Sequence, residues 1–147
     1  MSLTSSYETE IKIPEPQLDA FKANIKGTPC FDILQLAIDK VCKDRQGTQS
    51  RSYADCQGTA HPVLMAISTP GLPNGIGIDV NSERRIVFKY DQQGANIGEA
   101  QAIASEVNQV YATISHLRVL GQLGYRVSAH ESMQKNKRFI TINATRE

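Results

Sequence analysis

The chain has 147 residues, with 16 Lys+Arg, 15 Asp+Glu and a net charge of +1. A domain of this length buries about two-thirds of the surface that its unfolded chain exposes, so it needs neither disulfides nor metal to fold. The charge is −1 over residues 1–75 and +2 over residues 76–147, which argues against a general electrostatic attraction to nucleic acid or membrane. We expect one domain over residues 1–147.

The N-terminus lacks the basic-then-apolar pattern of a secretion signal, and the cysteines are odd in number: Cys30, Cys42 and Cys56. The longest apolar runs are a few residues, far below the roughly 20 that cross a bilayer. We therefore expect a reduced, cytoplasmic protein without a membrane span.

Within residues 7–13, Tyr7, Thr9, Ile11 and Ile13 alternate with charged side chains, which predicts a strand with one solvated face. Pro14 and Pro16 end this strand. Apolar residues at helical spacing then predict a short helix that reaches Gly27: Leu18, Phe21 and Ile25. A threonine followed by a proline, Thr28-Pro29, is typical of a new helix start, and apolar spacing predicts a second helix to about Lys43.

Residues 44–60 contain one aromatic residue and no aliphatic residue larger than alanine, so we expect a polar loop there. Structureless connections of this length are uncommon and are often functional. Arginine pairs bidentately with carboxylates, and tyrosine is a common anchor at interfaces. The sequence therefore suggests Arg45, Arg51 and Tyr53 as partner-binding residues, with a solvated linker as the alternative.

Residues 63–67 are apolar at nearly every position, which is typical of a strand covered on both faces, and we expect this strand to be central. Turn residues then separate it from two further alternating segments, residues 76–80 and 86–90. The three segments predict an antiparallel meander.

Residues 97–124 carry the longest periodic pattern of the chain and predict one amphipathic helix of roughly 40 Å. Its expected buried stripe is Ala100, Ile103, Val107, Val110, Ile114, Leu117 and Gly121. Two strands follow, at residues 125–129 and 139–142. We interpret the stripe as core packing in preference to a coiled coil, because only three heptads fit and flanking charges are sparse.

These elements predict an α+β fold, with a six-stranded, mainly antiparallel sheet and one long and two shorter helices on one face. The order can also be divided into two β-α-β-β units, although the two halves share no matching residues.

Four segments of the second half carry a resemblance: IGIDV, RRIVFKYD, VYATISHLRVLGQLGYRV and RFITIN. Together they resemble a small family of hypothetical proteins encoded in cyanobacteria and algal plastids, a domain of unknown function. The most specific feature is a helix with a tyrosine, Tyr111, that runs into Gly124-Tyr125 before a strand. The N-terminal third departs from the family, which has a single helix after its first strand. The resemblance implies an α+β domain without an assigned activity and suggests an ATPase of the AAA type as the partner.

The cysteines and His61 have intervals of 12, 14 and 5 positions, without the close C-x-x-C pair that forms a zinc site. We expect no metal and no cofactor. A cysteine nucleophile would need His61, His116 or His130 nearby, and no local pattern places one there. We expect Cys30 and Cys42 to be partly buried on helices and Cys56 to be exposed.

Gly75-Ile76-Gly77 lacks the third glycine and the helix start of a phosphate-binding turn, so a hairpin is the better interpretation. Basic residues gather at strand ends, where charge discourages edge pairing: Arg84, Arg85, Lys135, Lys137 and Arg138. RNA binding remains a lesser alternative, with Tyr90, Tyr125 or Phe139 as stacking residues.

No residue set in the sequence is typical of a catalytic mechanism, and we name no catalytic residue. The favoured hypothesis is a non-catalytic accessory module that binds a protein partner. The alternative is a small enzyme or ligand-binding domain whose site is built from dispersed residues. A deep pocket with two or more titratable side chains would favour this alternative.

Overall fold

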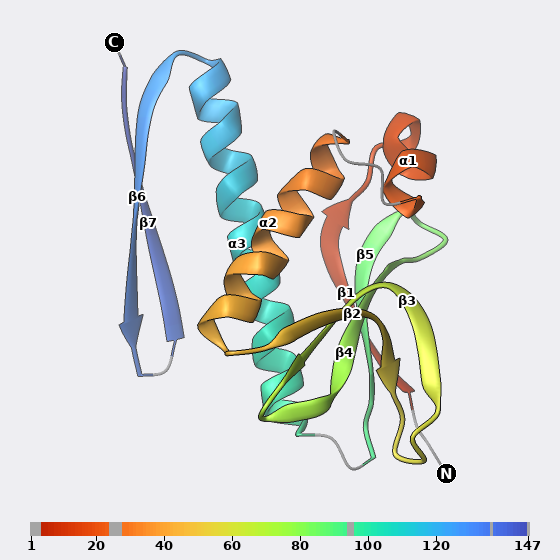
Figure 1. Cartoon of the computed structure of the whole chain (residues 1–147). Helices are drawn as coiled ribbons and strands as arrows, with labels where there is room; N and C mark the ends of the chain where they lie inside the picture. The colour runs from red at the N-terminus through yellow and green to blue at the C-terminus, as the bar shows by residue number, and fades with distance from the viewer. Residues whose placement is uncertain (1–3, 24–27, 94–95, 136, 147) are drawn as a thin grey trace.

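The computed structural model describes residues 4–23, 28–93, 96–135 and 137–146 (Figure 1). Over these residues the elements are β1 (Thr4–Lys12), a 3-10 turn η1 (Glu15–Gln17), α1 (Leu18–Lys22), α2 (Pro29–Asp44), β2 (Thr48–Ala54), β3 (Ala60–Thr69), β4 (Leu72–Val80), β5 (Arg85–Asp91), α3 (Ile97–Gln122), β6 (Tyr125–Gln134) and β7 (Lys137–Arg146). Ile25 and Gly27, which were expected in the first helix, lie outside the described residues.

The first five strands form the main sheet, in the order β1-β5-β4-β3-β2, and every pairing in it is antiparallel. The predicted α+β class, the mainly antiparallel pairing and the meander of β3, β4 and β5 are confirmed. The centre of this sheet is β4, although we expected residues 63–67, which belong to β3. An apolar pattern that indicates two covered faces does not distinguish β4 from β3, because each of these strands has a strand on both sides.

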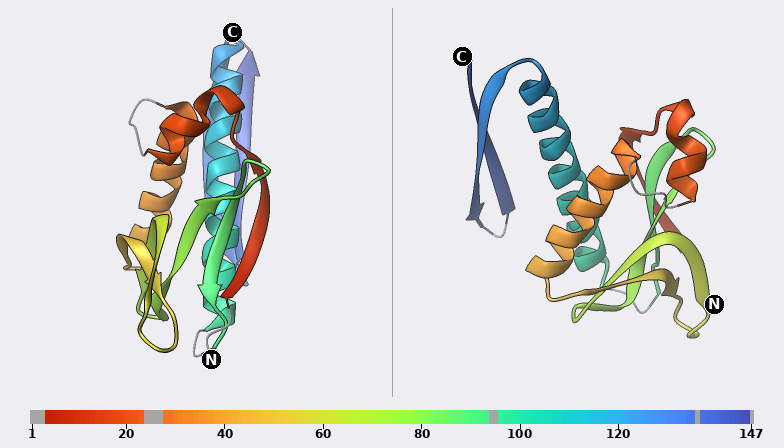
Figure 2. Two further views of the ribbon diagram at one scale, coloured as in Figure 1. Left: turned by 90° about the vertical axis from the view of Figure 1, so that its right-hand side faces the viewer. Right: turned by 45° about the horizontal axis from the view of Figure 1, so that its top comes forward.

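The last two strands form a separate two-stranded sheet, here called the C-terminal hairpin (β6 and β7). We expected them in the main sheet, as two of six strands. Figures 1 and 2 show α3 between this hairpin and the five-stranded sheet, and the hairpin contacts α3. Alternation along a strand predicts a covered face, but it does not say which element covers it.

The polar loop expected at residues 44–60 is wrong, because this segment contains β2, an edge strand paired with β3. An edge strand is held by backbone hydrogen bonds, so it forms with few apolar side chains. One of its side chains, Tyr53, is nevertheless buried over β4. A Cβ added to Gly77 would lie 2.8 Å from Tyr53 Cδ1, so the ring can pack there only because residue 77 is glycine.

The core lies between one face of the main sheet and the two long helices, as predicted for helices on one face. Its sheet residues are cross-strand neighbours, such as Ile67 opposite Ile76 and Ile78 opposite Phe88. The buried residues that the helices contribute include Phe31, Leu34, Ile38 and Val41 on α2 and Ala100, Ile103, Val107 and Val110 on α3. Phe21 of α1 closes one end and contacts Phe31 edge-on, with ring centroids 5.9 Å apart.

The long helix begins and ends close to its predicted limits. Asn96 caps its start by accepting a hydrogen bond from the Glu99 N–H at 3.2 Å, and Gly124 follows its end with a φ of 87°. The predicted stripe is buried through Val110, whereas Leu117 is only half-buried and Gly121 is exposed. The C-terminal half of α3 therefore extends past the main core. Among the described residues, no helix is both long and apolar enough to cross a membrane.

We expect Val110→Asp to lower the free energy of unfolding by about 3 kcal/mol or more, because Val110 is 4% exposed and its replacement would bury an unpaired carboxylate. Val119→Asp is the matched control, since Val119 lies on the same helix and is 55% exposed. Urea unfolding of both variants measures the difference. Equal midpoints for the two would refute the assignment of this face of α3 to the core.

Candidate partner-binding site

Arg45 joins the two long helices. Its Nε donates to Glu106 Oε2 at 2.8 Å, and its terminal nitrogens pair with Glu99 and Glu106. The arginine side chain is 26% exposed, and the carboxylate side chains are less exposed still. The sequence predicted carboxylate pairing for Arg45, but both carboxylates belong to α3 of the same chain. Arg45 is thus occupied by an internal contact that holds the end of α2 against α3.

Tyr53 is 3% exposed, so in this structure it is not the exposed anchor that we expected. Its ring stacks on His61 of β3, with the centroids 5.1 Å apart and the planes 18° from parallel. Arg51 is exposed on β2. Of the three suggested partner-binding residues, only Arg51 is therefore exposed, whereas Arg45 is half-buried and Tyr53 is buried.

Asp55 organises the turn between β2 and β3. One carboxylate oxygen accepts hydrogen bonds from the N–H groups of Gln57 and Thr59, and the other lies 2.9 Å from His61 Nε2. The hydrogen bond with His61 is the largest cause that lowers the pKa of Asp55; burial opposes it, and the N–H groups of Thr59 and Gln57 lower the pKa further. The carboxylate is thus held ionised as part of the turn.

A second buried carboxylate, Asp91 at the end of β5, fixes the same turn from the neighbouring side. Its Oδ2 accepts a hydrogen bond from the Cys56 N–H at 2.7 Å, and its Oδ1 accepts one from the Gln93 N–H at 2.9 Å. Cys56 itself is exposed, Cys42 is buried and Cys30 is half-buried, so the predicted exposures are confirmed. These carboxylates have structural roles that their sequence positions did not reveal.

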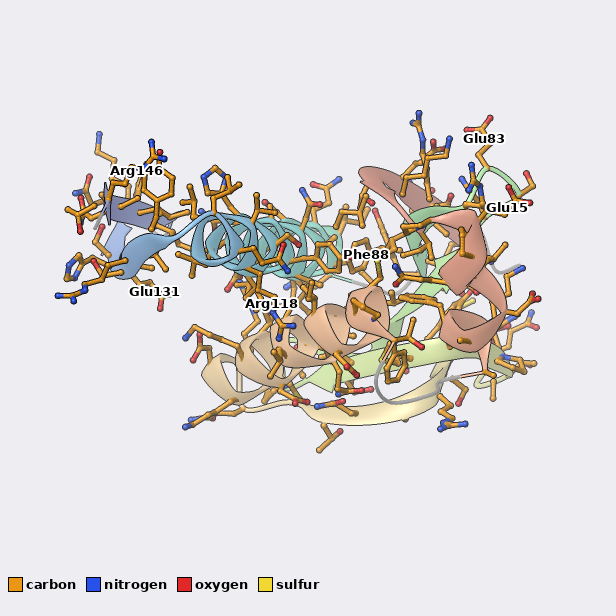
Figure 3. The ribbon with its side chains drawn as sticks, turned by 90° about the horizontal axis from the view of Figure 1, so that it is seen from above. Glu15, Glu83, Phe88, Arg118, Glu131 and Arg146 are labelled. Atoms are coloured by element: carbon orange, nitrogen blue, oxygen red, sulfur yellow. The ribbon has the colours of Figure 1, made fainter. Side chains whose placement is uncertain are left out.

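An open concavity with a volume of about 400 Å³ lies between α2, α3 and the C-terminal hairpin. We call it the groove. It is lined by Leu36 and Lys40 of α2, Val110, Thr113 and Ile114 of α3, and Ala129, His130, Glu131 and Ile140 of the hairpin. Figure 3 shows Glu131 and Arg146 on the hairpin, at the opposite end of the molecule from Glu15 and Glu83.

The groove has apolar walls and a charged rim. Lys40 Nζ lies 3.2 Å from Glu131 Oε2 and 3.2 Å from Asp44 Oδ2, so an ion pair connects α2 to the hairpin. The hydrogen bond with Asp44 is the largest influence on the pKa of Lys40 and raises it; partial burial lowers it, and Glu131 raises it again. Leu36 is 46% exposed at the wall and adds apolar surface to the groove.

Two further apolar side chains are exposed at the end of α3 and on the hairpin, outside the groove. Leu123 at the end of α3 is 64% exposed and Phe139 of β7 is 47% exposed. The signal in the sequence that could have indicated the groove is Leu36, an apolar residue on the side of α2 that the helical pattern assigns to solvent. The remaining lining residues come from distant segments, and no local pattern links them.

Within the described residues, no group of three His, Cys, Asp or Glu side chains is placed to hold a metal ion. Burial raises the pKa of the Tyr111 hydroxyl, and a hydrogen bond with the Cys30 thiol raises it further. The phenol therefore stays protonated within the core. Comparison with protein families, with characterised proteins and with solved structures finds no match.

Arg45→Met should lower the free energy of unfolding by about 1–3 kcal/mol, because Glu99 and Glu106 would lose their shared donor in a partly buried position. Arg51→Met removes an exposed arginine and should change the unfolding midpoint little. Urea unfolding at low salt compares them. If both variants unfold at the same midpoint, Arg45 does not fasten α2 to α3.

Asp55→Asn should destabilise the protein near pH 7 and lose this effect in acid. The folded pKa of Asp55 lies below its unfolded value of about 3.9, so the contribution of the carboxylate is present above that value and disappears as the pH falls through the folded pKa. Asparagine keeps an oxygen acceptor for the N–H groups of the turn but cannot ionise. Melting curves of both proteins between pH 7 and pH 2 should converge at the acidic end; a gap independent of pH would contradict this assignment.

Proposed function

We propose that the protein is a non-catalytic interaction module that binds a protein partner in the groove between α2, α3 and the C-terminal hairpin. The observation that carries this proposal is an open, mainly apolar concavity of about 400 Å³ with an exposed leucine, Leu36, at its wall. Interfaces place apolar anchors from one protein in pockets of the other, surrounded by a polar rim. The Lys40–Glu131 ion pair has the position of such a rim.

The groove replaces the segment at residues 44–60 as the proposed binding surface. Arg45 and Tyr53 of that segment are held by contacts within the chain, and Arg51 alone would make a small, polar contact. Transient protein interfaces need on the order of 1,000 Å² of buried area with good complementarity. The groove is lined mainly by apolar side chains from three elements, whereas the exposed residues of β2 are polar.

The C-terminal hairpin supports the proposal through its own energetics. A two-stranded sheet is marginally stable in water unless another element covers one of its faces. Val127, Ile140 and Ile142 of the hairpin are only half-buried, so part of their apolar surface is still exposed to water. A partner seated in the groove would cover more of these side chains and would stabilise the hairpin by mass action.

A second candidate is a ligand-binding domain, because the groove volume lies in the range of small-molecule pockets and three titratable residues line it: Lys40, His130 and Glu131. Its apolar walls would suit an apolar ligand. For the partner of the favoured function, an ATPase of the AAA type is a proposal that rests on the family resemblance alone.

Leu36→Asp should abolish capture of the partner from the native host while leaving the melting temperature within a few degrees, because Leu36 is 46% exposed. Val119→Asp, which also changes an exposed aliphatic residue but lies outside the groove, should retain capture. Quantitative mass spectrometry of captured proteins provides the measurement. Capture that survives Leu36→Asp would refute the groove, and a bound small molecule in protein purified from its host would favour the second candidate.

A further inference from the structure

β7 has an open edge that differs from the two edges of the main sheet. It pairs with β6 over ten consecutive residue pairs, from Lys137 opposite Gln134 to Arg146 opposite Tyr125, without a register shift. Over the described residues, β6 is the only strand beside it. The edge strands of the main sheet, β1 and β2, each contain a register irregularity. Such irregularities discourage further strand pairing, and β7 lacks one.

The sequence of β7 favours strand addition as well. Residues 139–145 read FITINAT, with no charged residue and no proline, and four of the seven are β-branched. Proteins usually protect an edge of this kind with a lysine, a proline or a bulge in the strand. An uncharged, regular edge with high β-propensity is therefore suited to accept another extended chain by backbone hydrogen bonding.

Charge distinguishes between the possible occupants of this edge. Residues 112–147 contain six Lys+Arg and two Asp+Glu, a net charge of +4, whereas residues 1–111 carry −3. Basic residues stand on both sides of the uncharged segment: Lys135, Lys137 and Arg138 before it and Arg146 after it. Pairing β7 with β7 of a second copy would bring two basic regions together. An acidic strand would complement them.

We propose that an extended segment of an acidic partner protein adds to the open edge of β7 as the third strand of this sheet. The added segment would carry acidic residues on both sides of an apolar centre. This inference deepens the proposed function and rests on it, because Ile140 of β7 also lines the groove. Alternate side chains of the added strand would extend the same apolar face that Ile140 presents. Backbone hydrogen bonds would give affinity, and the flanking charges would give register and selectivity.

Nucleic acid is the competing class of partner, since the hairpin is basic and Phe139 is exposed. The strand is the better fit for two reasons. The centre of β7 is uncharged, whereas phosphate recognition requires positive charges along the path of the backbone. The regular, unpaired edge is a feature that strand pairing requires and that phosphate binding does not.

The test uses the full chain labelled with ¹⁵N and a synthetic ten-residue peptide with two glutamates at each end and alternating valine and threonine between them. Two control peptides carry lysines at the ends, or N-methyl groups on the central amides that remove donors. A ten-nucleotide oligouridylate is the nucleic-acid probe. We expect the glutamate peptide to slow amide exchange in β7 and to bind about tenfold more tightly than either control peptide.

The protein variant Lys137→Glu/Arg138→Glu should bind the lysine peptide more tightly than the glutamate peptide, which reverses the preference of the unchanged protein. Lys12→Glu/Lys22→Glu is the matched control, because it changes the net charge equally at exposed residues of β1 and α1 and should leave the preference unchanged. Protection of β7 without peptide, with a dimer in sedimentation, would overturn the proposal in favour of a second copy. Equal binding of the N-methylated peptide, or protection of β7 by oligouridylate alone, would also overturn it.

The two proposals fail separately. If the glutamate peptide does not protect β7 while Leu36→Asp still abolishes partner capture, strand addition is wrong and the groove stands. If the peptide protects β7 while Leu36→Asp leaves capture intact, the groove is wrong and the edge of β7 remains a strand-binding site.

Discussion

The burial of α3 is the interaction on which both parts of the molecule depend. Its first half packs under the main sheet and α2, where Ile103 and Val107 are fully buried, and each such side chain contributes about 1.5–3 kcal/mol. A helix of 26 residues is about 39 Å long, and its second half extends past that core. The C-terminal hairpin covers this second half incompletely. The groove is therefore a direct consequence of a helix that is longer than the layer it supports.

The fold was predictable where one period dominates the sequence. The helical spacing of α3 gave its start at Ile97 and its end within two residues, because packing and the flanking Asn96 and Gly124 agree with the pattern. β2 was missed because its stability comes from backbone pairing and from Tyr53, which packs over Gly77 of another strand. That contact joins residues that are 24 positions apart, and no local pattern contains it. The separate place of the hairpin was missed for the same reason.

The candidate site was less predictable than the fold. Arginine at residue 45 was correctly associated with carboxylates, but the sequence does not say whether Glu99 and Glu106 or a partner supplies them. The groove depends on the relative position of three elements, and its residues look ordinary in isolation. Leu36 is a single apolar residue on a polar helix face, and Ile140 fits any strand. Concavity is a property of the assembled chain, so it becomes visible only with the structure.

The division into a main core and a hairpin has a consequence for binding. The five-stranded sheet draws its stability from a core that contains none of the β6 and β7 residues whose burial is described. Changes in the order of the hairpin can therefore occur without disturbing that core.

A third strand on β7 would turn a marginally stable two-stranded sheet into a three-stranded sheet. Sheets of three strands that pack against a helix are large enough to be stable. Part of the binding free energy would then be used to order the hairpin, which lowers the affinity for the partner. In return, binding in the groove would favour an ordered β7, and an ordered β7 would favour binding in the groove. The hairpin is connected to the rest of the domain by the contacts of both its strands with α3 and by the Lys40–Glu131 ion pair with α2, so these are the contacts that a bound strand would reinforce.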